Sequence, residues 1–210
     1  MFNWFRGRLP APTLDSLRFA TDGLALTLHE DLREVWHAPD GDVISKQLIF
    51  RPDRVKIESI AQLRESIVLG LADTRVRLVE VVMSRLDGLP AIRVIRKVPQ
   101  KPSGMTYAGS FTLGFRDFAF VIQAQCIERG TTGIRETLLM DRALAAKTVV
   151  IESAQPLRIV GDWEPDADRH DADFPEHPVS RLRRILRRIE SSCSIDALVR
   201  KHRLAHVPKA

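Results

Sequence analysis

The stretch Phe118-Ala119-Phe120-Val121-Ile122-Gln123-Ala124-Gln125-Cys126 decides the fold of this chain. Every second side chain, starting with Phe118 and ending with Cys126, is apolar, and both glutamines fall on the other side. This period of two is typical of a β-strand with one buried face. Residues 114–117 form a link short enough to join the strand, as an antiparallel hairpin, to an aromatic-rich stretch at residues 106–113.

Three Asp-Gly pairs divide the preceding residues into further strands. Both residue types tolerate the positive φ of a tight turn, and each pair stands beside a stretch of β-forming residues. We therefore predict strands near residues 24–28, 34–38, 43–50, 76–85 and 91–98. A short apolar segment at residues 148–151 is predicted to add an edge strand.

Two amphipathic helices interrupt these strands. Ser59 and Gln62 have the form of a capping box, and apolar residues follow at helical spacing, which predicts a helix over residues 59–71 that covers one sheet face. A second helix is predicted from residue 134 to about residue 146. Its expected buried stripe consists of Ile134, Leu138, Leu139 and Ala143.

Strand pairs joined by hairpins around two helices predict an α+β fold, an antiparallel β-sheet sandwiched by helices, with a C-terminal helical extension.

Charge divides the last fifty residues into an acidic block and a basic block. Residues 161–178 carry seven acidic side chains and one arginine, whereas residues 179–210 carry nine basic side chains and two acidic ones. We expect an N-terminal arm (1–20), the α+β sandwich domain (21–160), an acidic linker (161–178) and a basic helical C-terminal module (179–210).

Composition fits one globular body with an appended module. The chain has 210 residues, of which 44% are apolar, and a net charge of +5. Cys126 and Cys193 belong to no metal-binding or disulfide spacing. The longest apolar runs are far shorter than the roughly 18 residues that span a bilayer. These features predict a cytoplasmic protein without a membrane span.

The order of paired strands, a helix, a four-stranded meander and a closing helix resembles the PsbP/Mog-like αβα sandwich family. The resemblance covers roughly residues 20–146 and includes the aromatic-rich hairpin at residues 107–111 and 118–120. It implies a noncatalytic module, because members of this fold class mostly bind proteins and some bacterial ones serve as small export chaperones.

One candidate anion site precedes the second helix. Residues 130–133 read Gly-Thr-Thr-Gly, and free backbone N–H groups at a helix N-terminus can hold a phosphate or carboxylate. The alternative is an ordinary turn in which a threonine hydroxyl caps the helix. The residues of the candidate site are Arg129, Thr131, Thr132 and Arg135.

The acidic block contains side chains that could bind a metal ion. Its alternating acids resemble a calcium loop, but Ala167 replaces the glycine that the sharp turn of an EF-hand requires. Three prolines predict an extended, solvated linker instead. We expect no metal site, no cofactor and no catalytic activity. The side chains considered as possible metal ligands are Asp162, Glu164, Asp166, Asp168, Asp171, Asp173, His170 and His177.

The basic tail is predicted to begin with a strongly amphipathic helix. Leu182, Ile185, Leu186 and Ile189 form an apolar stripe, and five arginines, including Arg184 and Arg188, take the opposite face. A second helix is expected from Ile195 to the basic run at residues 200–203. The first stripe can pack on the chain's own body, on a second subunit or on another protein. A nucleic acid or a membrane surface could alternatively meet the arginines.

These observations favour a noncatalytic protein-binding, adaptor or chaperone-like module, with a protein partner or a homo-oligomer. The candidate partner-binding residues are Leu182, Ile185, Leu186, Ile189, Arg184 and Arg188. The alternative function is a nucleic-acid-associated protein that uses the basic C-terminal helices. The adjacent acidic block weakens this alternative, because it competes with a polyanion for the arginines.

Overall fold

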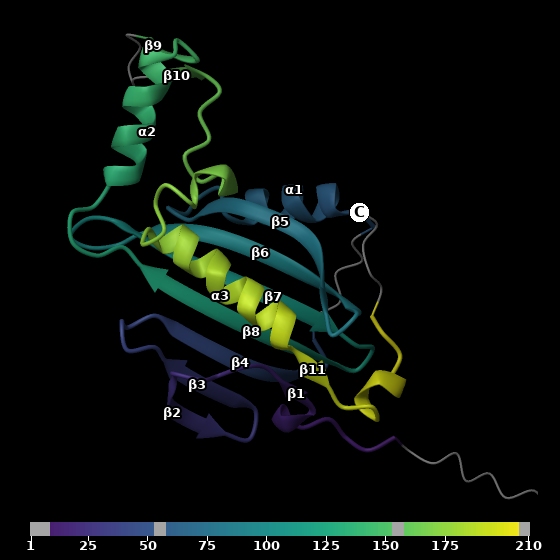
Figure 1. Cartoon of the computed structure of the whole chain (residues 1–210). Helices are drawn as coiled ribbons and strands as arrows, with labels where there is room; N and C mark the ends of the chain where they lie inside the picture. The colour runs from purple at the N-terminus through teal and green to yellow at the C-terminus, as the bar shows by residue number, and fades with distance from the viewer. Residues whose placement is uncertain (1–8, 53–57, 153–157, 206–210) are drawn as a thin grey trace, which may run out of the picture.

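A large antiparallel sheet forms the body of the protein (Figure 1). The computed structural model describes residues 9–52, 58–152 and 158–205. Within them, seven strands pair in the order β2-β3-β4-β8-β7-β6-β5, so the α+β class and the seven predicted strands of the sheet are confirmed. The strands are β2 (Ala25–Glu30), β3 (Arg33–His37), β4 (Val43–Phe50), β5 (Arg77–Leu86), β6 (Leu89–Pro99), β7 (Met105–Gly114) and β8 (Phe118–Ile127).

The C-terminal helix α3 (Pro178–Ser192) covers one face of the sheet and lies across β7 and β8 (Figure 1). Its apolar stripe is buried against the aromatic side of these strands, where Phe111 and Phe120 are also buried. Gly109 in β7 permits the close approach, because a Cβ at this position would lie 2.7 Å from Cδ1 of Leu186. The helix that was expected to be an extension is therefore part of the core.

The helix α1 (Ile60–Gly70) follows β4 and contacts β5 at the edge of the sheet. Ser59 accepts a hydrogen bond from the backbone N–H of Gln62, as the capping pattern predicted. None of the α1 side chains is buried. The helix therefore covers the sheet less closely than its apolar spacing indicated.

The N-terminal and C-terminal parts of the described chain pair with each other next to α3. A short 3-10 helix, η1 (Leu14–Ser16), leads into β1 (Leu17–Arg18), which pairs with β11 (Ser194–Ile195). Between β11 and Ala205, the last described residue, the one helical element is a 3-10 helix, η3 (Val199–Lys201). The second tail helix predicted from Ile195 was therefore wrong, because this apolar residue belongs to a strand pair.

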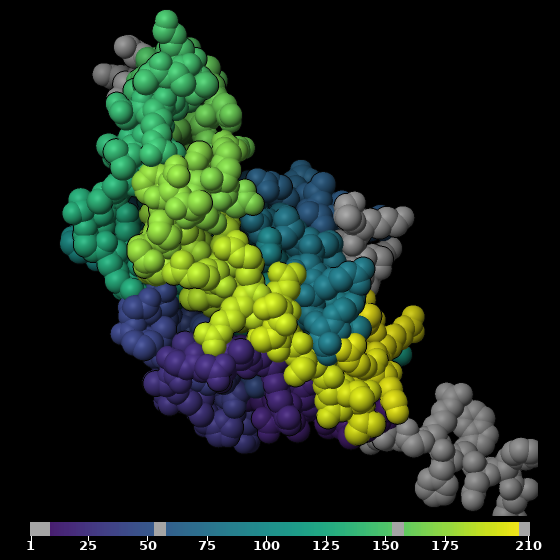
Figure 2. Space-filling model, in the orientation of Figure 1, coloured from purple at the N-terminus to yellow at the C-terminus, as the bar shows by residue number. Residues whose placement is uncertain are grey.

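The segment after β8 projects from the body (Figures 1 and 2). It consists of α2 (Ile134–Ala145), β9 (Val149–Glu152) and β10 (Arg158–Gly161), and we call these three elements the projection. β9 pairs with β10 in a separate two-stranded sheet rather than at the edge of the large one, which corrects the predicted edge strand. The predicted stripe of α2 was also wrong in part, since Leu139 is buried but Ile134 and Leu138 are exposed. No helix among the described residues is long and apolar enough to cross a membrane.

Candidate functional site

The predicted partner-binding stripe of α3 is used within the chain itself. Leu182, Leu186 and Ile189 are fully buried on the sheet, and Ile185 packs partly against the same core. These side chains are not available to a second protein, which corrects the prediction that they bind a partner. Periodicity identified the apolar face of the helix but could not show which surface covers it.

Two exposed arginines of the same helix contact nearby acidic residues. A guanidinium nitrogen of Arg184 lies 3.8 Å from Glu176, and one of Arg188 lies 3.3 Å from Asp22. Solvent surrounds both pairs, so each stabilises the fold by only about 0–1 kcal/mol. Arg184 and Arg188 remain surface residues, but part of their charge is balanced locally.

Two other arginines of α3 are buried, which the sequence did not indicate. Nε of Arg181 lies 3.0 Å from Oδ2 of Asp42, a buried carboxylate that also accepts a 2.6 Å hydrogen bond from Arg129. Arg183 pairs with Asp171 at 3.0 Å and donates to the backbone oxygen of Asp166. The basic and acidic blocks are therefore folded onto each other in part.

The predicted anion site does not assemble. Arg129 turns toward Asp42 and the guanidinium of Arg135 turns toward residues 165–171, while the hydroxyl of Thr132 contacts Ser103. Thr131 only lines a neighbouring pocket. The helix terminus does bind a carboxylate, but it belongs to Glu128, whose Oε1 accepts a 2.6 Å hydrogen bond from the N–H of Gly133.

Arg135 is the main anchor of the projection. Its side chain has no exposed surface, and it donates to the backbone oxygens of Pro165 and Ala167, each at 2.8 Å. It also donates to the hydroxyl of Ser180 at 2.8 Å and pairs with Asp171 at 3.2 Å. This one side chain thus connects α2, the acidic segment and α3.

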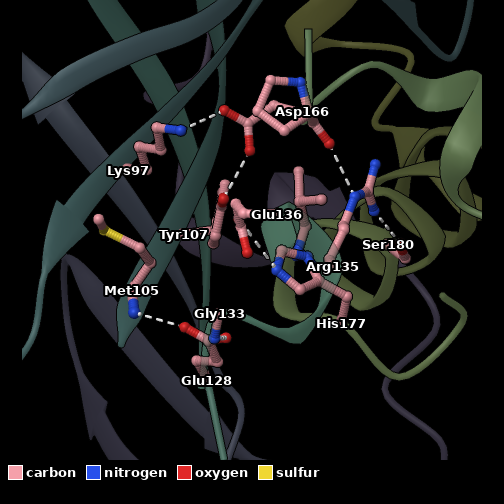
Figure 3. A network of polar contacts seen from close by, with 12 residues as sticks. Lys97, Met105, Tyr107, Glu128, Gly133, Arg135, Glu136, Asp166, His177 and Ser180 are labelled. Carbon is pink, nitrogen blue, oxygen red and sulfur yellow. Dashed lines mark hydrogen bonds and ion pairs between the residues drawn. The ribbon is translucent and has the colours of Figure 1, made fainter. Parts of the chain in front are cut away.

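The acidic segment is consequently not an extended linker. It contains several turns and a 3-10 helix, η2 (Asp168–His170), and its backbone oxygens receive the arginine hydrogen bonds. Asp166 accepts a 2.6 Å hydrogen bond from the hydroxyl of Tyr107 and pairs with Lys97 (Figure 3). Pro165 and Pro175 lie in turns, and Pro178 begins α3, so the prolines do not keep this segment extended.

A polar cluster lies where the projection joins the body (Figure 3). Glu128 follows β8, Glu136 lies in the first turn of α2, and His177 is the N-cap residue of α3. One potential ligand atom from each of the three residues lies within 4.8 Å of the others. We call these residues the junction cluster. The sequence did not predict it, because its members are separated by up to 49 positions and only the fold brings them together.

Burial controls the protonation of the junction cluster. It lowers the pKa of His177 to about 4, with a further contribution from the positive charge of Arg135, so this imidazole is neutral at pH 7. Burial also raises the pKa of Glu136, and the nearby carboxylate of Glu128 acts in the same direction. The cluster therefore combines a neutral nitrogen ligand with two carboxyl groups that repel each other.

A pocket of about 240 Å³ opens beside the junction cluster, with Glu128 and His177 in its wall.

Both thiols of the chain are buried elsewhere, and burial raises the pKa of Cys126 and of Cys193. Neither thiol is thus activated as a nucleophile.

The chain matches no protein-family model and no curated protein.

Proposed function

We propose that this chain is a noncatalytic protein-binding module of the adaptor or chaperone type, and that it docks through the projection. The observation that carries this proposal is the concentration of exposed apolar side chains there. Of the sixteen large apolar side chains that are exposed in the described part of the chain, seven belong to the projection. They are Ile134, Leu138, Leu144, Val150, Ile151, Ile159 and Val160. Exposed apolar patches of this kind mark interaction surfaces.

The two-stranded sheet supplies the surface. Val149 is buried in β9, which contacts α2, so the next side chain along the strand, Val150, points to the opposite face. Val150 is 60% exposed and lies directly across from Val160. Each strand also has an edge that is unpaired within the described residues, and a two-stranded sheet is marginal without further packing.

The occupant that we propose is a second copy of the chain. Glu152 lies directly across from Arg158 on the same face as the two valines, so the exposed face carries one charge of each sign. A two-fold axis through this face places the glutamate of one copy near the arginine of the other and buries the valines between them. A surface of this kind is complementary to itself.

The order of elements supports the proposed relation to the PsbP/Mog-like fold. The chain has a first group of strands, a helix, a meander of four strands and a further helix, which is similar to the element order on which the resemblance rests. Protein binding is the usual activity of that fold class. The nucleic-acid alternative has less support, because Arg181 and Arg183 are buried in ion pairs and are not available to phosphates.

Isosteric substitution tests the proposal. Val150→Thr/Val160→Thr removes the apolar surface while keeping β-branched side chains that suit a strand. In a symmetric dimer each change counts twice, so we expect sedimentation velocity to show a dimer dissociation constant raised at least about tenfold. Val68→Thr is the control, since Val68 is also exposed but lies on α1. A wild-type chain that is monomeric at every soluble concentration, or a double variant that associates normally, would refute docking through this surface.

A further inference from the structure

We propose that the junction cluster is a binding site for a divalent transition-metal cation, with Zn²⁺ as the best match. Glu128, Glu136 and His177 are the protein ligands, and the pocket beside them leaves room for water at a remaining position. One imidazole and two carboxylates form a nitrogen and oxygen donor set that suits Zn²⁺. The site is independent of the apolar surface at the far end of the projection.

His177 gives the first indication of a ligand. Its side chain is only 6% exposed, yet Nε2 has no hydrogen-bond partner among the residues that the structure describes. The nearest carboxylate oxygen, Oε1 of Glu136, lies 3.7 Å away, which is too far for a hydrogen bond. A buried polar atom without a partner costs about 1–3 kcal/mol, so a native structure normally provides one. A cation between the two side chains would satisfy this nitrogen.

The two glutamates give the second indication. Oε2 of Glu136 is also buried, and no described residue forms a hydrogen bond with it. Glu128 is buried beside it, and the two carboxylates repel each other. A divalent cation would neutralise both negative charges and remove this repulsion. Neither a water molecule nor a monovalent cation balances both charges.

The separations between the ligand atoms are slightly longer than those of a tetrahedral site. Zn–N and Zn–O bonds of about 2.0–2.1 Å separate neighbouring ligand atoms by roughly 3.4 Å. The ligand atoms of the junction cluster lie within 4.8 Å of one another, and the imidazole nitrogen is already 3.7 Å from Glu136. Contraction of these separations by at most about 1.4 Å therefore brings the ligand atoms to coordination distance.

Surrounding groups hold the ligands in position. Oε1 and Oε2 of Glu128 accept hydrogen bonds from the N–H groups of Gly133 and Met105, at 2.6 and 2.9 Å. The imidazole ring packs edge-on against Tyr107, with 5.5 Å between the ring centroids. Carboxylate ligands that also accept hydrogen bonds are typical of metal sites, because the outer contacts orient the donor atoms.

The histidine must lose one weak contact when the cation binds. Nδ1 of His177 accepts a long hydrogen bond of 3.4 Å from the N–H of Val179. Coordination through Nε2 places the ring proton on Nδ1, so this hydrogen bond is exchanged for the metal bond. The exchange costs little because the hydrogen bond is at the limit of its distance range.

The cation would connect three parts of the fold. Glu128 directly follows β8, Glu136 lies in the first turn of α2, and His177 caps the N-terminus of α3. Binding to the folded chain alone would raise its stability in proportion to the logarithm of the free metal concentration. It would also fix the base of the projection, because two of the three ligands flank the link between β8 and α2.

Isothermal titration calorimetry of the full chain with Zn²⁺ and, separately, with Mg²⁺ tests the site. We expect one equivalent of Zn²⁺ to bind and Mg²⁺ to bind at least about tenfold more weakly, because the histidine favours the transition metal. We expect Glu136→Gln and His177→Asn each to weaken Zn²⁺ binding at least about tenfold. Asparagine keeps an acceptor at the N-cap of α3, so the second variant retains its helix start.

Matched controls separate this site from histidines elsewhere. His170→Asn changes a histidine of η2 outside the junction cluster, and it should leave Zn²⁺ affinity unchanged. Circular dichroism of each variant verifies that it is folded, and Zn²⁺ should raise the melting temperature of wild type but not of Glu136→Gln. The proposal is overturned by absence of Zn²⁺ binding, by preference for Mg²⁺, or by equal Zn²⁺ affinity in folded Glu136→Gln and His177→Asn.

Discussion

Arg135→Met should destabilise the protein more than the substitution of any exposed arginine, because the Arg135 side chain is fully buried. Methionine has a similar length and helix propensity, so the change removes the guanidinium group without disturbing α2 itself. The guanidinium makes four contacts, with the backbone oxygens of Pro165 and Ala167, with Ser180 and with Asp171. All of them lie at the base of the projection.

The expected loss of folding stability depends on which contacts the partners of Arg135 keep after the substitution. A hydrogen bond to a charged group contributes about 1.5–3 kcal/mol, but four bonds from one side chain are not additive. Asp171 keeps its ion pair with Arg183 at 3.0 Å, so its carboxylate is not left alone. Removing one partner of a buried ion pair costs about 3–5 kcal/mol, and we expect a loss within this range.

Urea unfolding followed by circular dichroism measures the loss as a shift of the midpoint at constant m-value. Arg187→Met is the matched control, because Arg187 is exposed on α3 and should change stability by less than about 0.5 kcal/mol. Hydrogen exchange should also become faster in residues 161–177 of Arg135→Met. A loss below about 1 kcal/mol, together with unchanged exchange in that segment, would refute the assignment of Arg135 as the anchor.

Two further substitutions test how α3 and the C-terminal segment are held. Gly109→Ala places a Cβ 2.7 Å from Cδ1 of Leu186, so this buried side chain or α3 itself must shift, and we expect urea unfolding to show a loss of stability of about 1–3 kcal/mol. The pKa of Asp87 lies below its usual value of 3.8, because its carboxylate accepts the N–H of Ile195 and pairs with Arg200. The stability from this lowered pKa is present above about pH 4 and is lost as the pH falls through the folded-state value. Asparagine also tolerates positive φ, so Asp87→Asn keeps the turn. The substitution removes the negative charge that pairs with Arg200, so the variant should unfold more readily than wild type at pH 7, and the difference in stability should shrink below pH 4. An equal difference at pH 3 and pH 7 would contradict this account.

The large sheet could be predicted because its signals are local. Alternating side chains identify strands such as residues 118–126, and the Asp87-Gly88 pair forms a turn in which both residues have positive φ. The amphipathic pattern likewise located α3. Such patterns give the element and its apolar face, but they do not name the surface that covers that face. The sequence therefore left open whether the chain's own body or a partner covers the stripe of α3, and the structure shows that the sheet of the same chain covers it.

The polar sites could not be predicted because they depend on distant residues. Arg135 stands in an ordinary helical pattern, and its burial follows only from carbonyl groups thirty or more residues away. The junction cluster combines residues from three elements in the same way. Ile195 shows the opposite error, since a short apolar run fits a helix or a strand, and pairing with β1 selects the strand.

The charge separation in the last fifty residues acts mainly inside the molecule. Arg181 and Arg183 are buried in ion pairs, and the acidic segment supplies carboxylates and backbone oxygens to arginines of α2 and α3. A basic run in the sequence thus attracts a polyanion only to the extent that folding leaves its charges unpaired. Because the apolar stripe beneath these arginines is also buried, the surface that remains for a partner is the apolar projection. Its base is fixed by Arg135 and, in our proposal, by a metal ion.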